Sequence, residues 1–267
     1  MKKIIALILA LTLALSLAAC GGAGNSKTIK VGTAPGPHAE IMESVKEALA
    51  KEGYTLEIVE FSDYILPNTA LDEGQIDANY FQHITYMNGF NEEHGLKMVS
   101  AAGIHYEPMG LYAGKTASID ALPEGAQIAV PNDATNEARA LLLLEQEGII
   151  KLTEGIGLNA TKSDIVENPK NVEIVEMKAE LLTTTLQDVD MAVINGNYAI
   201  GAGLKVAEAL AVEAADGAAA DAYMNVIAVM AGKENDAKIQ ALVKALKTDA
   251  VKAFIEEKYQ GAVVPLF

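Results

Sequence analysis

A short segment in the middle of the chain combines an amide and a guanidinium at a spacing suited to binding an anion. It runs from residue 131 to residue 139, with the sequence Pro-Asn-Asp-Ala-Thr-Asn-Glu-Ala-Arg, between an expected strand and an expected helix. Asn136 falls near the helix N-terminus, where free backbone N–H groups and the helix dipole favour a negative charge. Arg139 lies three residues later on the same face, and its guanidinium can grip a carboxylate with two parallel hydrogen bonds. Ordinary N-capping beside a surface arginine is the alternative interpretation.

Two further amides and a group of aromatic residues are candidates for the rest of a binding pocket. Asn195 follows an apolar strand in the sequence Asn-Gly-Asn-Tyr, which on its own is equally typical of a plain turn. Asn225 opens the last strand as a single amide among apolar residues, and a hydrogen bond to a loop would explain it as well. Aromatic residues gather at the start of a helix, in the run Tyr-Phe-Gln-His at 80–83 and at Tyr86. That cluster alone favours a packed core over a pocket.

The sequence lacks the usual signatures of enzymes. It has no Gly-x-Ser-x-Gly, no P-loop, no His-Glu-x-x-His and no Gly-x-Gly-x-x-Gly. The four histidines, at positions 38, 83, 94 and 105, have no close metal-ligand spacing, although a zinc or manganese receptor could collect them from afar. We therefore expect no enzymatic activity and no required cofactor or metal, and the residues favour binding of a small solute.

The elements that would hold these residues alternate between strand and helix. Strands are predicted at 28–33, 54–61, 76–80, 97–101, 109–113, 126–130, 172–177, 191–194 and 225–230. Helices are predicted at 39–51, 67–73, 83–93, 136–147, 179–187, 236–247 and 248–258, with Ala-rich helix and loop over 199–222. Such alternation predicts an α/β protein with mainly parallel sheets, and the chain is long enough for two lobes rather than one.

The N-terminus carries the pattern of a lipoprotein signal. Lys2 and Lys3 precede an apolar run that ends in Leu-Ala-Ala-Cys-Gly-Gly. This pattern predicts a secretion signal at 1–19, cut before Cys20; a membrane helix that stays attached is the alternative, but it needs about 20 apolar residues. Cys20 is the only cysteine, and the match to the lipobox implies a diacylglyceryl group on it, whose two acyl chains make a stable anchor. Residues 20–27 would form a lipidated, small and polar tether.

The charge balance excludes several partners. The chain has 36 acidic and 20 basic residues and a formal net charge of −16, and cleavage would remove Lys2 and Lys3 as well. Nucleic acid and anionic lipid repel such a chain, so we expect no nucleic-acid partner and attachment to the membrane through the lipid. The expected state is a monomer, lipid-anchored to the cell membrane on its extracytoplasmic face.

Several blocks of sequence, in order along almost all of the mature chain, resemble one known family. The blocks are Phe-Ser-Asp-Tyr at 61–64, Leu-Pro-Asn at 66–68, Asp-Ala-Asn-Tyr-Phe-Gln-His at 77–83, Glu-Pro-Met-Gly at 107–110, Asn-Glu-Ala-Arg at 136–139, Ala-Val-Ile-Asn-Gly-Asn-Tyr-Ala at 192–199 and Gly-Ala-Val-Val-Pro at 261–265. They resemble the methionine-binding lipoproteins of ABC importers, the NlpA or MetQ type. The resemblance implies a receptor that captures L-methionine or a close analogue and delivers it to the permease of an ABC transporter.

The resemblance also implies an architecture. The expected fold is α/β, of the two-lobed periplasmic-binding-protein kind (type II), with the ligand in a cleft between the lobes. The first lobe would comprise residues 28–111 and 230–267, and the second lobe residues 112–229. Two crossings between the lobes would form a hinge, and closure of a hinge around the ligand is the usual motion of such receptors.

The ligand contacts implied by the resemblance follow from position in the matching blocks. Arg139, helped by Asn136, would bind the ligand carboxylate. Asn195 and Asn225 would hold the amino and carboxylate groups. The remaining candidates would wall the pocket for the ligand side chain: Tyr64, Phe81, His83 and Tyr86, with His105 as a further candidate. These roles fit the residue types, because a zwitterion needs charge-assisted and amide partners and a thioether favours aromatic contact.

The chain departs from the family pattern at a few positions, and these bear on its ligand. The family usually has Gly where Ala138 stands, Lys-Pro in place of Ile84 and Thr85, and Pro-Arg in place of Thr183 and Thr184. The Ala-rich stretch departs as well. Positions 84 and 85 adjoin the pocket candidates His83 and Tyr86, so the change bears on which ligand side chain the pocket selects. D-methionine, a methionine dipeptide and another apolar amino acid are therefore alternative ligands. A surface lipoprotein for adhesion or scaffolding is the alternative from another class.

Overall fold

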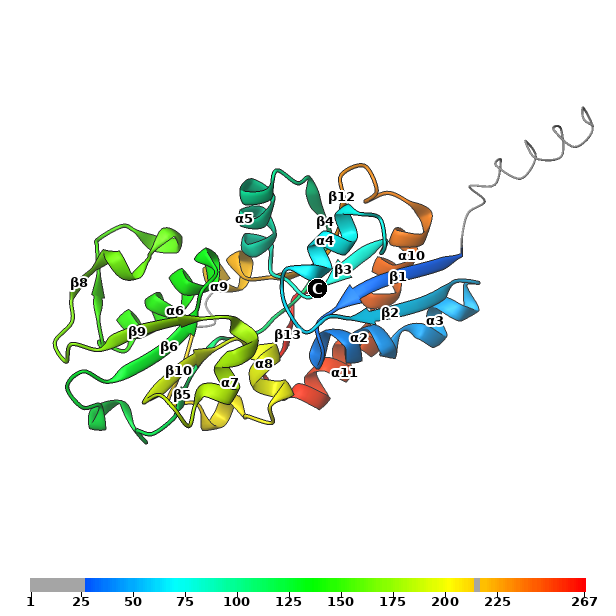
Figure 1. Ribbon diagram of the computed structural model, residues 1–267. Helices are drawn as coiled ribbons and strands as arrows, with labels where there is room; N and C mark the ends of the chain where they lie inside the picture. The colour runs from blue at the N-terminus through cyan, green and yellow to red at the C-terminus, as the bar shows by residue number, and fades with distance from the viewer. Residues whose placement is uncertain (1–26, 214–216) are drawn as a thin grey trace, which may run out of the picture.

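The structure, a computed structural model, describes residues 27–213 and 217–267 and consists of two lobes (Figure 1). Each lobe has its own β-sheet covered by helices. The predicted signal at 1–19 and the predicted lipid site at Cys20 lie outside the described residues. Within the described ranges, no helix combines the length and the apolar character that crossing a membrane requires.

The first lobe is built on a six-stranded sheet in the order β13-β4-β12-β3-β1-β2. Its strands are β1 (Thr28–Thr33), β2 (Thr55–Glu60), β3 (Ala78–Tyr80), β4 (Met98–Tyr106), β12 (Asn225–Met230) and β13 (Val264–Pro265). β1 pairs in parallel with β2 and β3, whereas β12 runs antiparallel to both of its neighbours. β12, the strand by which the chain returns from the second lobe, therefore lies inside this sheet and is antiparallel to β4 and β3.

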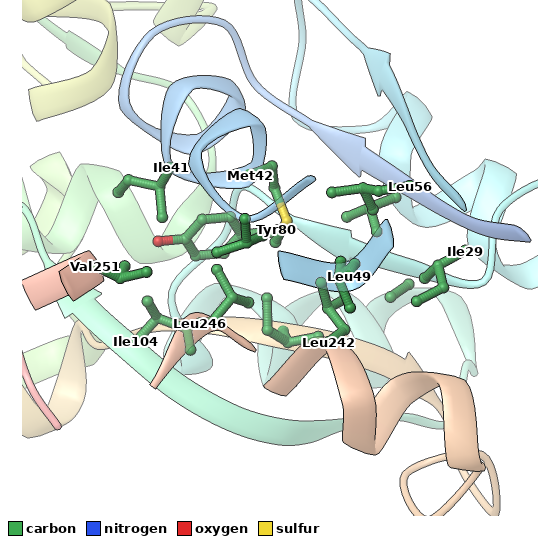
Figure 2. Close-up of a cluster of buried hydrophobic side chains, with 14 of the residues drawn as sticks. Ile29, Ile41, Met42, Leu49, Leu56, Tyr80, Ile104, Leu242, Leu246 and Val251 are labelled. Carbon is green, nitrogen blue, oxygen red and sulfur yellow. The ribbon is translucent and has the colours of Figure 1, made fainter. Parts of the chain in front are cut away.

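Helices cover both faces of the first sheet because successive residues of its strands point to opposite sides. The helices are α2 (Pro37–Ser44), α3 (Lys46–Lys51), α4 (Leu66–Asp72), α5 (Ile84–His94), α10 (Ala237–Leu246) and α11 (Asp249–Tyr259). On β12, Ile227 and Val229 pack with α2, α3, α10 and α11, whereas Val226 and Ala228 pack with α4 and α5. Figure 2 shows the first of these cores, in which apolar side chains from strands and helices surround the buried Tyr80.

The second lobe contains a five-stranded sheet in the order β11-β5-β10-β6-β9. Its strands are β5 (Gly110–Ala113), β6 (Gln127–Pro131), β9 (Glu173–Met177), β10 (Met191–Ile194) and β11 (Ala211–Val212). The helix α6 (Ala134–Gln146) packs on one face, and α7 (Leu182–Thr185) with α8 (Gly196–Gly201) packs on the other. Residues of β10 again alternate between the two cores, which fixes the register of this strand.

Shorter elements complete the second lobe. They are the strands β7 (Lys151–Leu152) and β8 (Ile165–Glu167), the helix α9 (Gly217–Ala222), and the 3₁₀ turns Ile119–Ala121, Gly157–Asn159, Lys162–Asp164, Ala179–Leu181 and Val206–Glu208. β7 and β8 pair with each other in a separate two-stranded ribbon. This ribbon and the edge strands β11 and β13 are too short to leave a periodic pattern, so the sequence did not predict them.

The order of strands and helices agrees with the prediction, but the one helix predicted at 39–51 is divided into α2 and α3, and two further details differ. The expectation of mainly parallel sheets is wrong, because both sheets are mixed. The chain also changes lobe earlier than expected. β5, which begins at Gly110, already belongs to the second sheet, and β12, which begins at Asn225, already belongs to the first. Each crossing between the lobes therefore comes before its predicted boundary, at 111 or 229. A strand is assigned to the lobe whose sheet it pairs with, and both strands pair with the sheet of the lobe that the chain is entering.

Candidate functional site

A pocket between the two lobes brings together eight of the nine predicted binding residues. The space between its lining residues that no protein atom fills, part of it open to solvent, is ≈ 330 Å³. The first lobe and the first crossing contribute Tyr64, Phe81, Gln82, His83, Tyr86, Glu107 and Asn225. The second lobe contributes Asn136, Arg139, Asn195, Gly196 and Asn197. The ninth predicted residue, His105, is buried behind this wall rather than in it.

The pocket lies at the N-termini of three helices. His83 is the N-cap of α5, and its Nδ1 accepts a hydrogen bond from the backbone N–H of Tyr86 at 3.0 Å. Asp133 is the N-cap of α6, and its carboxylate accepts from the backbone N–H of Asn136 at 3.0 Å. Asn195 occupies the N-cap position of α8. The expected turn before Asn136 is thereby confirmed, and the positive ends of the helix dipoles favour a negative group in the pocket.

The amide of Asn136 is used within the protein and orients its neighbours. Its Oδ1 accepts hydrogen bonds from Nδ2 of Asn195 at 2.8 Å and from Nε2 of His83 at 3.2 Å. Its Nδ2 donates to both carboxylate oxygens of Asp133, each at 2.9 Å. Burial, assisted by the charge of Arg139, lowers the pKa of His83 to about 3, so its imidazole is neutral and can donate only from Nε2.

Buried amides in the pocket present atoms that lack a partner among the described residues. These atoms are Oδ1 of Asn195, an acceptor, and Nδ2 of Asn197, a donor. The other end of each amide is fixed, since Asn195 donates to Asn136 and Oδ1 of Asn197 accepts from the hydroxyl of Tyr64. Buried polar atoms normally have hydrogen-bond partners, so these two atoms are suited to a polar ligand. Asn197 was not among the predicted residues, although it stands in the same Asn-Gly-Asn sequence as Asn195.

The guanidinium of Arg139 is held by an ion pair on the side away from the pocket. Its Nε and Nη2 donate to the two carboxylate oxygens of Glu213 at 2.8 and 2.6 Å, and Nη2 also donates to the backbone carbonyl of Glu107 at 2.7 Å. The ring of Tyr223 lies 4.1 Å from the guanidinium carbon, within range of a cation–π interaction. Among the hydrogen bonds of the described residues, Nη1 makes none.

Glu213 joins the first crossing to Arg139. Besides the arginine, one of its carboxylate oxygens accepts from the hydroxyl of Tyr106 at 2.6 Å and from the backbone N–H of Met109 at 3.1 Å. Tyr106 ends β4 and Met109 precedes β5, so both donors flank the segment that leads from one lobe to the other. Burial and the carboxylate of Glu213 raise the pKa of Tyr106 against the opposing effect of Arg139, so Tyr106 stays a neutral donor.

Aromatic rings form part of the wall of the pocket. The ring of Tyr64 lies 5.8 Å from that of Phe81 and 5.8 Å from that of Tyr86, measured between centroids. Phe81 and Tyr86 are 6.1 Å apart in an edge-to-face arrangement. These distances are typical of favourable aromatic pairs, and the hydroxyl of Tyr86 donates to the backbone carbonyl of Tyr64 at 3.0 Å. The predicted aromatic cluster is therefore both a packed cluster and a pocket wall.

Glu107 lies in the first crossing and was not predicted as a site residue, although it belongs to one of the matching sequence blocks. Its side chain is 6% exposed, and Nε2 of His105 lies 2.8 Å from its Oε1. Nδ1 of His105 in turn faces the hydroxyl of Tyr80. Burial by itself raises the pKa of a carboxyl, but the neighbouring His38, His105 and Arg139 outweigh it, and the pKa of Glu107 lies below its usual value.

The described residues contain one group whose ligand atoms are close enough together to hold a metal ion. It consists of His38, His105 and Glu107, and its ligand atoms all lie within 4.8 Å of one another. Their hydrogen bonds argue against that use. Nε2 of His38 faces Oδ1 of Asn225 at 2.9 Å, whereas its Nδ1 has no partner among the described residues. A metal on Nε2 would move the proton to Nδ1 and bury an unpaired donor, which is unfavourable. The residues fit a hydrogen-bonded network better than a metal site.

Two hydrogen bonds from tyrosines tie the lobes together beside the pocket. Tyr64, in the first lobe, donates to Oδ1 of Asn197 in the second. Tyr198, in the second lobe, donates to the backbone carbonyl of Ser62 in the first at 3.0 Å. The helices α5 and α6 also pack against each other across the lobes. The structure therefore represents a closed arrangement, in which the pocket is shielded from solvent.

Two lobes joined by two crossings, with a polar and aromatic pocket between them, define a two-lobed periplasmic-binding-protein fold. A sequence model described as NlpA lipoprotein matches residues 29–267. The chain belongs to the NlpA lipoprotein family, as its sequence blocks predicted.

Three relatives show how far the similarity extends. The methionine-binding lipoprotein MetQ of Bacillus subtilis is 38% identical over 275 residues, which cover 100% of this chain and 99% of the relative. The D-methionine-binding lipoprotein MetQ of Salmonella typhimurium is 40% identical over 268 residues, which cover 98% and 97%. Among solved structures, a nutrient binding protein from Burkholderia cenocepacia bound to methionine has a TM-score of 0.85 and 45% identity, and the match covers 90% of this chain and 100% of that one.

Substitution of Glu213 by Ala should destabilise the protein strongly. Arg139 is 4% exposed and Glu213 is 11% exposed, and removing one partner of a buried pair typically costs about 3–5 kcal/mol, because a buried charge is left uncompensated. Urea denaturation measures the change in the free energy of unfolding. The matched control is Glu208→Ala, which removes the exposed partner of Lys205 and should cost less than about 1 kcal/mol. Equal effects of the two substitutions would contradict this role of Glu213.

Proposed function

We propose that this protein is the lipid-anchored solute receptor of an ABC importer and that its ligand is L-methionine. One observation carries the proposal: one pocket is lined by ionic and amide groups together with aromatic rings. A free amino acid with an apolar side chain likewise combines a charged end with an apolar end. The relatives named for methionine support the choice of side chain.

The carboxylate of the ligand would lie against Arg139. Its Nη1 can donate to an oxygen, and the N-termini of α6 and α8 add favourable positive potential. Asn225 would donate as well, because His38 engages its Oδ1 and so leaves its Nδ2 for the ligand. Asn136 would act through its neighbours, since both ends of its amide already have partners. It holds Asn195 in the orientation that presents an acceptor to the pocket.

The side chain of the ligand would lie against Tyr64, Phe81 and Tyr86. A thioether sulfur about 5 Å from an aromatic ring gains about 0.3–1.5 kcal/mol per contact, and methionine can meet several rings at once. His83 closes this part of the pocket as a neutral ring, so it adds no charge beside an apolar group. The same surroundings would accept D-methionine, a methionine dipeptide or another apolar amino acid, which remain the closest alternatives.

A surface lipoprotein for adhesion or scaffolding is the alternative from another class. Such a protein has no need of an arginine buried between two lobes, and the burial of Arg139 to 4% exposure favours a receptor. Buried charged and polar groups that are left incompletely paired are unfavourable for stability and are therefore expected where a ligand completes them.

A thermal-shift panel tests the ligand. The purified lipoprotein in detergent, denatured and refolded to remove any bound solute, is heated with each common amino acid, D-methionine and Gly-Met. L-Methionine at about 100 times its dissociation constant should stabilise the protein by about 2.7 kcal/mol, which is readily measured. A larger shift with another compound would keep the receptor class and change the ligand. A panel without any shift would favour the adhesion or scaffold alternative.

Arg139→Ala should weaken binding of L-methionine by about 2–5 kcal/mol, because a buried carboxylate would lose its charged partner. Isothermal titration calorimetry gives the affinities. Because this substitution also leaves Glu213 unpaired, Arg139→Lys is measured beside it, after circular dichroism has shown that both variants are folded. Lysine keeps the charge but loses the planar fork, so it should bind more weakly than the native protein and more tightly than the alanine variant. Native affinity in either variant would place the ligand carboxylate elsewhere.

Cys20→Ser should release the protein from the membrane without changing its affinity for the ligand. Serine lacks the thiol that carries the acyl chains, and without them the protein has no stable anchor. Fractionation of cells into membrane and soluble material, with metabolic labelling by a radioactive fatty acid, measures the outcome. Ser26→Ala, in the tether, is the matched control and should stay in the membrane fraction. Labelling of the Cys20→Ser variant would contradict the assignment of the lipid site.

A further inference from the structure

Arg139 is the only arginine of the chain, and all the other basic residues are lysines. Its side chain is 4% exposed. Hydrogen bonds hold it along one edge, where Nε and Nη2 donate to Glu213 and Nη2 also donates to the carbonyl of Glu107. Bonds along one edge leave both faces of the guanidinium uncovered, and the face of a planar cation is suited to stacking against an aromatic ring.

The ring of Tyr223 covers one of these faces. The guanidinium carbon lies 4.1 Å from the centroid of this ring, whereas it lies 5.7 Å from that of Tyr106. Tyr223 is itself 4% exposed, and a cation–π interaction is stronger when both partners are removed from water. Burial raises the pKa of Tyr223 to about 12 against the opposing charge of Arg139, so the ring is neutral and acts through its π face.

Tyr223 lies in the second crossing between the lobes, and the chain is fixed on both sides of it. Its own N–H donates to the carbonyl of Ala219 in α9, in the second lobe, at 2.9 Å. The carbonyl of the next residue, Met224, accepts from the N–H of Ile84 at 3.0 Å, at the start of α5 in the first lobe. The ring also meets the imidazole of His83 edge to face, with 5.2 Å between centroids. Contacts from both lobes therefore hold this ring in place.

We infer that Tyr223 is a positioning residue for Arg139, whose guanidinium it holds in the orientation that leaves Nη1 for the carboxylate of the ligand. The inference rests on the proposed function and gives a role to a residue that does not line the pocket. Hydrogen bonds along one edge would let Arg139 and Glu213 tilt together, and a ring packed against the face of the guanidinium opposes that tilt. Arg139 thereby contacts both crossings, the first at Glu107 and the second at Tyr223.

NMR can test this contact without any ligand, because the chain has a single arginine. Isotopically labelled arginine gives one Nε–H signal, which is recorded on the lipoprotein in detergent after it has been denatured and refolded. The ring current of an aromatic side chain shields nuclei above its face. Tyr223→Leu should therefore move the signal downfield, and Tyr223→Phe should leave it close to its native position. Tyr54→Leu, at a half-buried tyrosine of the first lobe, is the control and should not move it, whereas an unchanged signal in Tyr223→Leu would overturn the inference.

Tyr223→Leu should weaken binding of L-methionine by about 5- to 30-fold, which corresponds to the loss of a buried cation–π contact of about 1–2 kcal/mol. Tyr223→Phe keeps the ring and should stay within about 3-fold of the native affinity. Isothermal titration calorimetry measures both, after circular dichroism has shown that the variants are folded. A loss in Tyr223→Phe as large as that expected for leucine would assign the effect to the hydroxyl and overturn the inference, and this test holds even where the leucine variant does not fold.

A second background separates positioning from a general disturbance of the pocket. Lysine at position 139 is a compact point charge without a planar face, so a ring at position 223 has no guanidinium to orient. In the Arg139→Lys protein, Tyr223→Leu should therefore change the affinity for L-methionine by less than about 3-fold. The same loss in both backgrounds would show that Tyr223 supports the pocket by packing alone and would overturn its positioning role.

Failure of this role is distinguishable from failure of the proposed function. Binding of L-methionine by the native protein, combined with an unchanged affinity in Tyr223→Leu, would overturn the role of Tyr223 and leave the receptor assignment in place. If the native protein bound no compound of the thermal-shift panel, the proposed function would fail, and the role of Tyr223 toward a ligand carboxylate would fail with it.

Discussion

The ion pair between Arg139 and Glu213 is the interaction on which the arrangement of the pocket depends. Glu213 accepts from the guanidinium, from the hydroxyl of Tyr106 and from the backbone of Met109, and Arg139 also holds the carbonyl of Glu107. These contacts fix the first crossing between the lobes at the point where it borders the pocket. Since a buried pair is stable only when its remaining hydrogen bonds are satisfied, the crossing has little freedom to move while the pair is intact. Arg139 and Glu107, both of which line the pocket, are therefore positioned together.

Most of the fold could be predicted from local pattern, because each strand and helix carries its own period. The strand Met191–Ile194, its turn at Asn195 and the helix after it follow from the sequence alone. Strand direction could not be predicted in this way. It depends on which sheet a strand joins after crossing between lobes, and the antiparallel entry of β12 beside β3 is decided by long-range pairing. The edge strands β11 and β13 are only two residues each and leave no pattern.

The site could be predicted in part. Arg139 and Asn195 stand at strand-to-helix turns, so local chemistry indicated them as ligand groups, and the family blocks added the aromatic wall. Glu107 and Glu213 could not be found by such reasoning. Glu107 is one carboxylate among 36 acidic residues, and its burial depends on histidines from α2 and β4. Glu213 lies in an Ala-rich stretch that by pattern is helix and surface loop, and only the folded chain brings it to Arg139.

The buried charge of Glu107 also bears on how the lobes close. Water in an open cleft would hydrate this carboxylate, whereas the closed arrangement, with Tyr64 and Tyr198 hydrogen-bonded across the lobes, excludes most of that water. Closure therefore carries a desolvation penalty that the hydrogen bond between His105 and Glu107 offsets in part. The aromatic part of the wall presents no charge and carries no such penalty.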